Sequence, residues 1–284
     1  MARDRSYGLR LDLSRPFNRY RRTDFALTMM GIGRDWVTGQ IGQDFVPSYR
    51  RNVLYGELNY VTDTSLWGFT GPIDGGRSNF SITYSPGLGE YGLDFFTLRG
   101  ELRRYYRFSQ EFIIAVRLAG GRSEGRNPQQ FYLGGVDNWL NQAFKDGYLR
   151  VNSIEDIYFS RFETPFRGLD FYERIGNRFV LTNLEFRFPL IRYLQLGFPP
   201  PMAFYNVRGA LFADVGTAWR KSEPLLLWHA SGIVPTHLED LLMTYGVSAR
   251  SNLGFILLSY DVAWRTDLES TWKPRHVVSA GVEF

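Results

Sequence analysis

The sequence contains no cysteine, only three histidines, and no long apolar run. The lack of cysteine excludes a disulfide-stapled fold, and 284 residues can bury a core without one. No stretch approaches the roughly 18 apolar residues that a membrane-spanning helix needs, which excludes a helical membrane protein. The start of the chain also lacks the apolar segment of a secretory signal, so we expect a mature chain or a piece of a longer precursor.

Strong charge of one sign and catalytic motifs are missing as well. Lys and Arg number 33 against 29 Asp and Glu, without a basic block, so we expect no nucleic-acid partner. The histidines His229, His237 and His276 lack metal-ligand spacing, and no cofactor-binding or hydrolase motif is present. We therefore expect no metal, no cofactor and no enzymatic activity. One enzymatic alternative stays open, in which His276 pairs with Ser248 or Ser251 near one rim.

The chain is instead rich in aromatic residues, at 17%, and in residues that alternate with period two. In residues 7–14, Tyr7, Leu9, Leu11 and Leu13 share one face and polar residues share the other. Such alternation indicates a strand with one apolar and one wet face. About eleven segments are predicted as strands on this basis: 5–15, 22–33, 50–62, 77–85, 93–108, 111–121, 177–189, 207–219, 243–252, 254–266 and 276–284.

These features predict an all-β fold, a transmembrane antiparallel β-barrel of a bacterial outer membrane. The predicted strands are long enough to cross about 25 Å of hydrocarbon when tilted. Their polar faces carry charged residues at mid-strand, as a hydrated lumen requires, and aromatic residues gather near strand ends. The alternative is a soluble all-β sandwich, in which the apolar faces point inward.

Tight turns alternate with long loops along the chain, as in outer-membrane barrels. We predict one barrel domain over residues 1–284, with a long loop at about 122–176. One connection fits poorly, because 191–206 should be a short turn and spans about sixteen residues. Segments 225–228 and 237–242 are the only ones in which a short turn or helix is expected.

The last predicted strand ends in an alternating apolar face closed by an aromatic residue. Val278, Ala280, Val282 and Phe284 share that face. This pattern resembles the terminal signal by which bacterial outer-membrane proteins reach their assembly machinery. The alternative is an ordinary edge strand that ends in Phe.

Several segments in order resemble the C-terminal part of the surface-antigen barrel, the BamA-type outer-membrane assembly and secretion family. They are RNPQQFYLGGVDNWL at 126–140, FRGL at 166–169, GNRFVLTNLEFRFPL at 176–190 and RGALFADVGTAWR at 208–220, followed by the strands after 244. The segment FYLGGVDNWL is most similar to the corresponding segment of barrels that follow a TolB-like β-propeller in a long precursor. The family barrel has sixteen strands, so the resemblance implies either part of such a barrel or a complete smaller one.

The resemblance implies a role for the FRGL segment. In the family, the arginine of the V-R-G-F/Y loop folds into the lumen and pairs with acidic groups on the wall. Here this predicts a latch in which Arg167, beside Gly168 at the loop tip, pairs with Glu185 and Asp214, which strand parity places inward. Phe166 and Leu169 depart from the usual flanking residues. The alternative is that Arg167 is a solvated loop residue.

The resemblance implies a non-enzymatic protein that inserts or exports polypeptides or anchors an envelope complex. The implied partners are outer-membrane lipid and lipopolysaccharide, the barrel assembly machinery, and periplasmic proteins or lipoproteins. The alternatives are a passive solute channel and a structural subunit of a larger complex. The cluster of Arg99, Glu101, Arg103 and Arg107 is expected to line the lumen, as structure or as an anion-favouring wall, rather than to bind nucleic acid.

Overall fold

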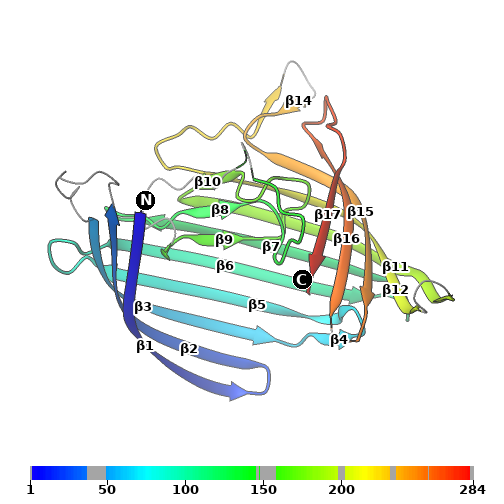
Figure 1. Cartoon of the computed structure of the whole chain (residues 1–284), viewed down its shortest axis with the longest axis horizontal. Helices are drawn as coiled ribbons and strands as arrows, with labels where there is room; N and C mark the ends of the chain where they lie inside the picture. The colour runs from blue at the N-terminus through cyan, green and yellow to red at the C-terminus, as the bar shows by residue number, and fades with distance from the viewer. Residues whose placement is uncertain are drawn as a thin grey trace, which may run out of the picture.

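The computed structural model describes residues 2–36, 49–144, 147, 158–197, 202–230, 235–254 and 256–281. Nearly all regular structure in these residues is β-strand (Figure 1). Among them no helix is long and apolar enough to cross a membrane.

One large antiparallel sheet contains the strands that the alternation predicts. Eleven strands follow one another in sheet order and in chain order, and β4 pairs with β5 beside them. All eleven predicted strands are confirmed. They are β1 (Ala2–Asn18), β2 (Arg21–Trp36), β3 (Tyr49–Asp63), β5 (Gly71–Pro86), β6 (Asp94–Arg107), β7 (Ile113–Glu124), β11 (Arg178–Leu196), β12 (Met202–Trp219), β15 (Leu242–Asn252), β16 (Leu257–Thr266) and β17 (Arg275–Ala280), with the short β4 (Leu66–Gly68).

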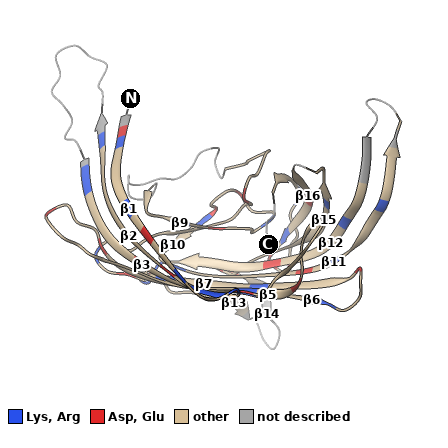
Figure 2. Cartoon of the chain, turned by 90° about the horizontal axis from the view of Figure 1, so that it is seen from below, with Lys and Arg blue, Asp and Glu red and all other residues tan. Residues whose placement is uncertain are grey.

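The sheet curves into a trough (Figure 2), and its two faces differ in chemistry. On β6, Phe95, Glu101 and Tyr105 are buried, whereas the alternating Leu102 and Tyr106 are exposed. Exposed Leu, Phe and Tyr recur in this way along the other strands of the sheet. An apolar outer face opposite a polar inner face is the arrangement of a membrane barrel, and the predicted fold class is confirmed.

The long loop after β7 folds back onto the concave side of the trough (Figure 2). It forms a three-stranded sheet in the order β10 (Arg174–Gly176), β8 (Phe131–Leu133) and β9 (Arg161–Glu163). All three β8 side chains are buried. We call this folded loop, over the described parts of residues 126–177, the plug.

Two expectations about connections are wrong. The segment 237–242, expected as a short turn or helix, begins instead in strand β14 (Pro235–Leu238), which pairs with β13 (Trp228–Ala230), because these residues satisfy their backbone groups across a hairpin. The connection 191–206 is mostly strand, because β11 and β12 continue beyond an irregularity near Pro189. Pro189 has no N–H to donate to the ladder, so the register shifts there and then resumes. The connection also contains three consecutive prolines, 199–201, all of which lie outside the described residues.

The two ends of the large sheet are not joined to each other in the described residues. The edge of β17 instead meets plug residues 138–141. Leu140 N donates to Val278 O at 2.8 Å, and Ala280 N donates to Asn138 O at 3.2 Å. The Asn141 side chain adds hydrogen bonds to Val278 N and His276 O, both at 2.8 Å. An unpaired edge leaves backbone groups unsatisfied, and the plug satisfies those of β17.

Candidate functional site in the barrel lumen

The two plug motifs found in the sequence lie next to each other. Phe166 and Gly135 exchange backbone hydrogen bonds of 2.7 and 3.0 Å, which joins FRGL to the GG of FYLGGVDNWL. Phe166 and Leu169 are fully buried and belong to one apolar cluster with Phe131 and Phe179. The residues that depart from the family pattern therefore pack the tip of the FRGL segment against the wall.

Arg167 lies between these two apolar residues and faces the wall. Its side chain is 0% exposed. Nε and Nη2 donate to the two oxygens of Asp214 at 2.9 and 2.7 Å, and Nη1 contacts Glu185 Oε1. The guanidinium also lies over the ring of Phe212 at 3.7 Å. A planar fork on a carboxylate with an aromatic face behind it fixes both the position and the orientation of the loop tip.

Glu185 is the acceptor that several arginines share. Arg250 on β15 donates to both of its oxygens at 2.7 and 3.1 Å, and Arg187 Nε donates at 2.7 Å. Glu185, like Asp214, is 0% exposed. Since a buried carboxylate needs charge partners and hydrogen bonds to stay ionised, the wall and the plug together supply what the lumen water would otherwise provide.

Three guanidinium groups share the two carboxylates of this cluster, because Arg167, Arg187 and Arg250 all contact Glu185 and Arg167 also contacts Asp214. Asp261 on β16 is fully buried and lies near Arg167 and Arg250.

Gly168 allows the turn that brings Arg167 to the wall. Its φ is +81°, which L side chains rarely adopt. A Cβ there would lie 2.8 Å from Cβ of Ala263 and 3.3 Å from Cγ2 of Thr244. The loop tip therefore lies directly on the lumen faces of β15 and β16. The residues of the predicted latch therefore come together in the structure, and their function as a latch stays a prediction.

A second set of contacts, which no sequence pattern predicted, fixes the plug to the wall. Arg99 on β6 donates to both oxygens of Glu163 on β9, at 2.6 and 2.8 Å. Arg117 on β7 donates to Thr164 O at 2.6 Å, and Arg161 lies 3.1 Å from Glu57. The alternating Arg99, Glu101 and Arg103 predicted a lumen wall, but the acidic partner in the loop had no signal in the sequence. We call residues Arg161–Thr164 and their partners the second clasp.

The remaining predicted residues lie apart from these contacts. His276 bonds to Tyr260 through Nδ1 at 2.7 Å, and β16 lies between His276 on β17 and the two serines, Ser248 and Ser251, on β15. The Ser–His pair that the sequence left open is therefore not formed. His229 and His237 stack at 5.4 Å. Within the described residues no group of three or more potential metal ligands occurs. Val278 and Ala280 are less buried than Val277 and Ser279, whereas Val282 and Phe284 lie outside the described residues.

Comparisons with known proteins agree with this fold. The chain is similar to the solved structure of BamA from Haemophilus ducreyi lacking POTRA domains 1–3, with a TM-score of 0.59 and 12% identity. The match covers 98% of this chain and 54% of that chain, so the chain spans about half the length of that structure. No curated protein sequence gives a significant match. The family model of the Omp85 superfamily domain matches residues 2–277, and the chain therefore belongs to the Omp85 superfamily.

Proposed function

We propose that this chain is the barrel of a bacterial outer-membrane protein that inserts or exports polypeptides and catalyses no chemical reaction. The family match over residues 2–277 is the observation that carries the proposal. The likeness to the BamA structure covers 98% of this chain and supports the fold that the proposal requires. The proposed partners are outer-membrane lipid, lipopolysaccharide and the barrel assembly machinery, with periplasmic or lipoprotein subunits, and the proposed unit is one barrel domain over residues 1–284.

The attachment of the plug to the wall supports this proposal. Arg167 with its wall partners forms one latch, and Arg99 with Glu163 forms a second point of attachment. A plug that is attached to the wall in two places fills space through which solutes would otherwise pass. This favours the insertion or export role over a passive solute channel, which would need an open lumen.

The test is a folding assay in liposomes. An eight-stranded outer-membrane barrel denatured in urea is diluted into vesicles that contain this chain, and its folding is followed by the heat-dependent shift in gel mobility. We expect folding at least several-fold faster than in vesicles that contain an unrelated barrel of equal mass. Equal rates in both vesicle types would contradict the insertion role and favour an anchoring subunit.

A further inference from the structure

An apolar groove lies on the outer face of the sheet, over the neighbouring strands β1, β2 and β3 (Figure 1). Its volume is about 670 Å³, within the range of small-molecule sites. Ile32 and Val53 pack with plug residue Phe159, so the residues that alternate with them face away from the lumen. Apolar side chains from three strands and one loop line the groove: Tyr7, Leu9, Met29, Leu54 and Leu88.

The strand register places three rows of three residues on this face, with one residue of each row on each strand. In order along the strands, the rows are Leu9, Met29 and Leu54, then Tyr7, Gly31 and Asn52, then Arg5, Gly33 and Arg50. The face therefore changes from apolar to basic over about 13 Å of strand. Arg5 and Arg50 leave the backbone about 10 Å apart, which is two strand spacings. Because Gly33 has no side chain, both guanidinium groups can reach one group between them.

The basic row lies at the end of the strands that carries the long connections. There β2 and β3 are joined through residues 37–48, and the loop after β5 brings Leu88 to the groove. The tight turn between Asn18 and Arg21 is at the opposite end. Long connections of outer-membrane barrels are extracellular, so this end meets the outer leaflet. An arginine on the lipid face costs much at the bilayer midplane and little at the interface, so Arg5 and Arg50 indicate the level of the headgroups.

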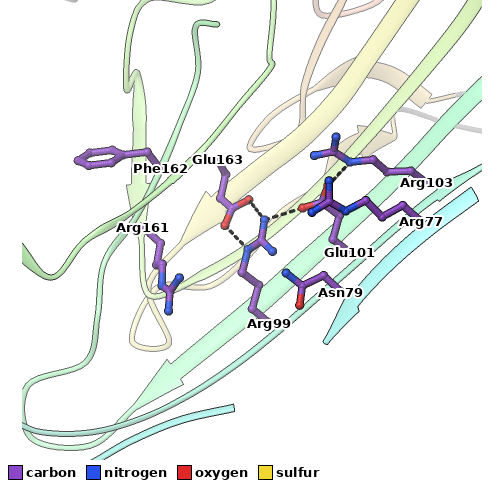
Figure 3. Close-up of a pocket in the computed structure, with 8 residues that line it drawn as sticks. All are labelled: Arg77, Asn79, Arg99, Glu101, Arg103, Arg161, Phe162 and Glu163. Carbon is purple, nitrogen blue, oxygen red and sulfur yellow. Dashed lines mark hydrogen bonds and ion pairs between the residues drawn. The ribbon is translucent and has the colours of Figure 1, made fainter. Parts of the chain in front are cut away.

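Arg50 differs from the arginines that face the lumen. Arg99 on β6 donates to both oxygens of Glu163 (Figure 3). Arg34, on the lumen face of β2, donates to Asp4 at 2.7 Å. Arg50 is exposed, and no carboxylate pairs with it in the part of the chain that the structure describes. An outward guanidinium group without an acidic partner, next to an apolar groove, suits a ligand that has an anionic headgroup and an apolar tail.

We propose that this groove binds the lipid A part of lipopolysaccharide. A phosphate group of the headgroup lies between Arg5 and Arg50, because phosphate oxygens match the guanidinium fork. Asn52 presents an exposed amide to the polar groups beside that phosphate. One acyl chain lies along the apolar row and contacts Leu88 at its side. The inference rests on the proposed outer-membrane location, which supplies lipopolysaccharide rather than phospholipid in the leaflet at this end.

The experiment is native mass spectrometry of the full chain in nonionic detergent, titrated separately with lipid A, phosphatidylglycerol and phosphatidylcholine. We expect one lipid A per chain, bound about tenfold more tightly than either phospholipid. The absence of saturable lipid A binding, or equally tight binding of either phospholipid, would overturn the proposal. The assay involves no polypeptide insertion, so a chain that fails the folding assay in liposomes and still binds lipid A would lose the proposed function and keep this site.

Charge variants locate the headgroup. Arg5→Gln and Arg50→Gln should each weaken lipid A binding about fivefold, because each arginine attracts the anionic headgroup at close range. Arg15→Gln is the matched control, since Arg15 lies on the same face of β1 as Arg5 at the opposite end of the strand. It should change binding less than about twofold. Equal losses in all three variants would mean nonspecific attraction and would overturn the site.

A loop variant locates the acyl chain. Leu88→Asn removes an apolar side chain from the groove and should also weaken lipid A binding several-fold. Leu226→Asn is the control, because Leu226 is a loop leucine of similar exposure (57% against 61%) outside the groove lining. Unchanged binding in Leu88→Asn, or equal losses in both variants, would contradict an acyl chain in this groove. Heat-dependent gel mobility shows that each variant is folded.

Discussion

Arg167 attaches the FRGL segment to the wall through several buried hydrogen bonds. Its guanidinium bonds to Asp214 through two nitrogens and contacts Glu185, and its own backbone N–H donates to Asp214 at 3.1 Å. Removal of one partner from a buried ion pair usually costs about 3–5 kcal/mol, because the other charge stays buried. The loop tip is therefore expected to depend on this one side chain.

Arg167→Ala should release the tip of the plug from the wall. We expect faster cleavage within residues 140–175 by proteinase K and a higher conductance in planar bilayers. Arg174→Ala is the matched control, since Arg174 lies in the same loop and its partner Asp240 is 3.8 Å away. If both variants behave like the unmodified chain, the latch assignment is wrong.

Gly168 offers a test of the loop geometry that leaves every charge in place. Gly168→Ala meets both an unfavourable φ of +81° and a close contact with Ala263, whereas Gly89→Ala meets a similar φ of +78° with nothing within 4 Å. We expect a larger drop in unfolding temperature for Gly168→Ala, because only this variant adds a clash to the backbone strain. Equal drops would show that the tip does not rest on the wall.

At the scale of elements, β17 depends on the plug for its outer edge. Asn141 bonds to the backbone of Val278 and His276, each at 2.8 Å. Asn141→Ala should raise the hydrogen-exchange rate of the Val278 amide about tenfold, because that N–H loses its acceptor. Asn252→Ala, which removes a comparable bond to Phe69 O at 2.8 Å, serves as the control and should leave that amide unchanged. An unchanged rate in Asn141→Ala would indicate that the edge is protected in another way.

The predicted assembly signal begins with Val278 and Ala280 in β17, and its last residue, Phe284, lies outside the described residues. Deletion of Phe284 should lower the amount of heat-modifiable barrel in the outer membrane, because the sequence pattern predicts that this residue belongs to the signal. Quantitative gel analysis of membrane fractions measures this. Normal levels in the deletion variant would show that the C-terminal pattern is only that of an ordinary edge strand.

At the scale of the whole molecule, two separate sets of contacts, the latch and the second clasp, join the plug to the wall. The latch joins the plug to β11 and β12, and the second clasp joins it to β6 and β7 through Arg99 and Arg117. Rigid attachment at two places restricts the plug far more than either contact alone, because release then requires both to open. We therefore expect the plug to stay in the trough unless both sets of contacts open.

Combining Arg167→Ala with Glu163→Gln tests this arrangement. Each single variant leaves one attachment, so we expect a modest rise in bilayer conductance from each and a rise greater than their sum from the double variant. Single-channel recording measures the effect. An additive double variant would mean that the two clasps act on independent parts of the loop.

The strands and their faces could be predicted from the sequence because period-two alternation is a local property. Tyr106 and Leu102 had to share a face whatever the remaining chain did, and the same holds for Asp214 and Phe212. The prediction of a long connection at 191–206 was wrong for a local reason, because Pro189 interrupts the ladder without ending the strands. Membrane chemistry reinforces the pattern by requiring an apolar outer face.

The path of the plug was decided only by the tertiary structure. Arg167 and Asp214 are 47 residues apart, and Arg99 and Glu163 are 64 residues apart, so no local pattern links them. A family resemblance predicted the role of Arg167 in the FRGL segment, whereas no sequence pattern predicted a role for Glu163 or Asn141. The sequence by itself determined a membrane barrel with a polar lumen. Which loop residues fill that lumen depends on charge and shape complementarity between distant segments, which exists only once the sheet has curved around them.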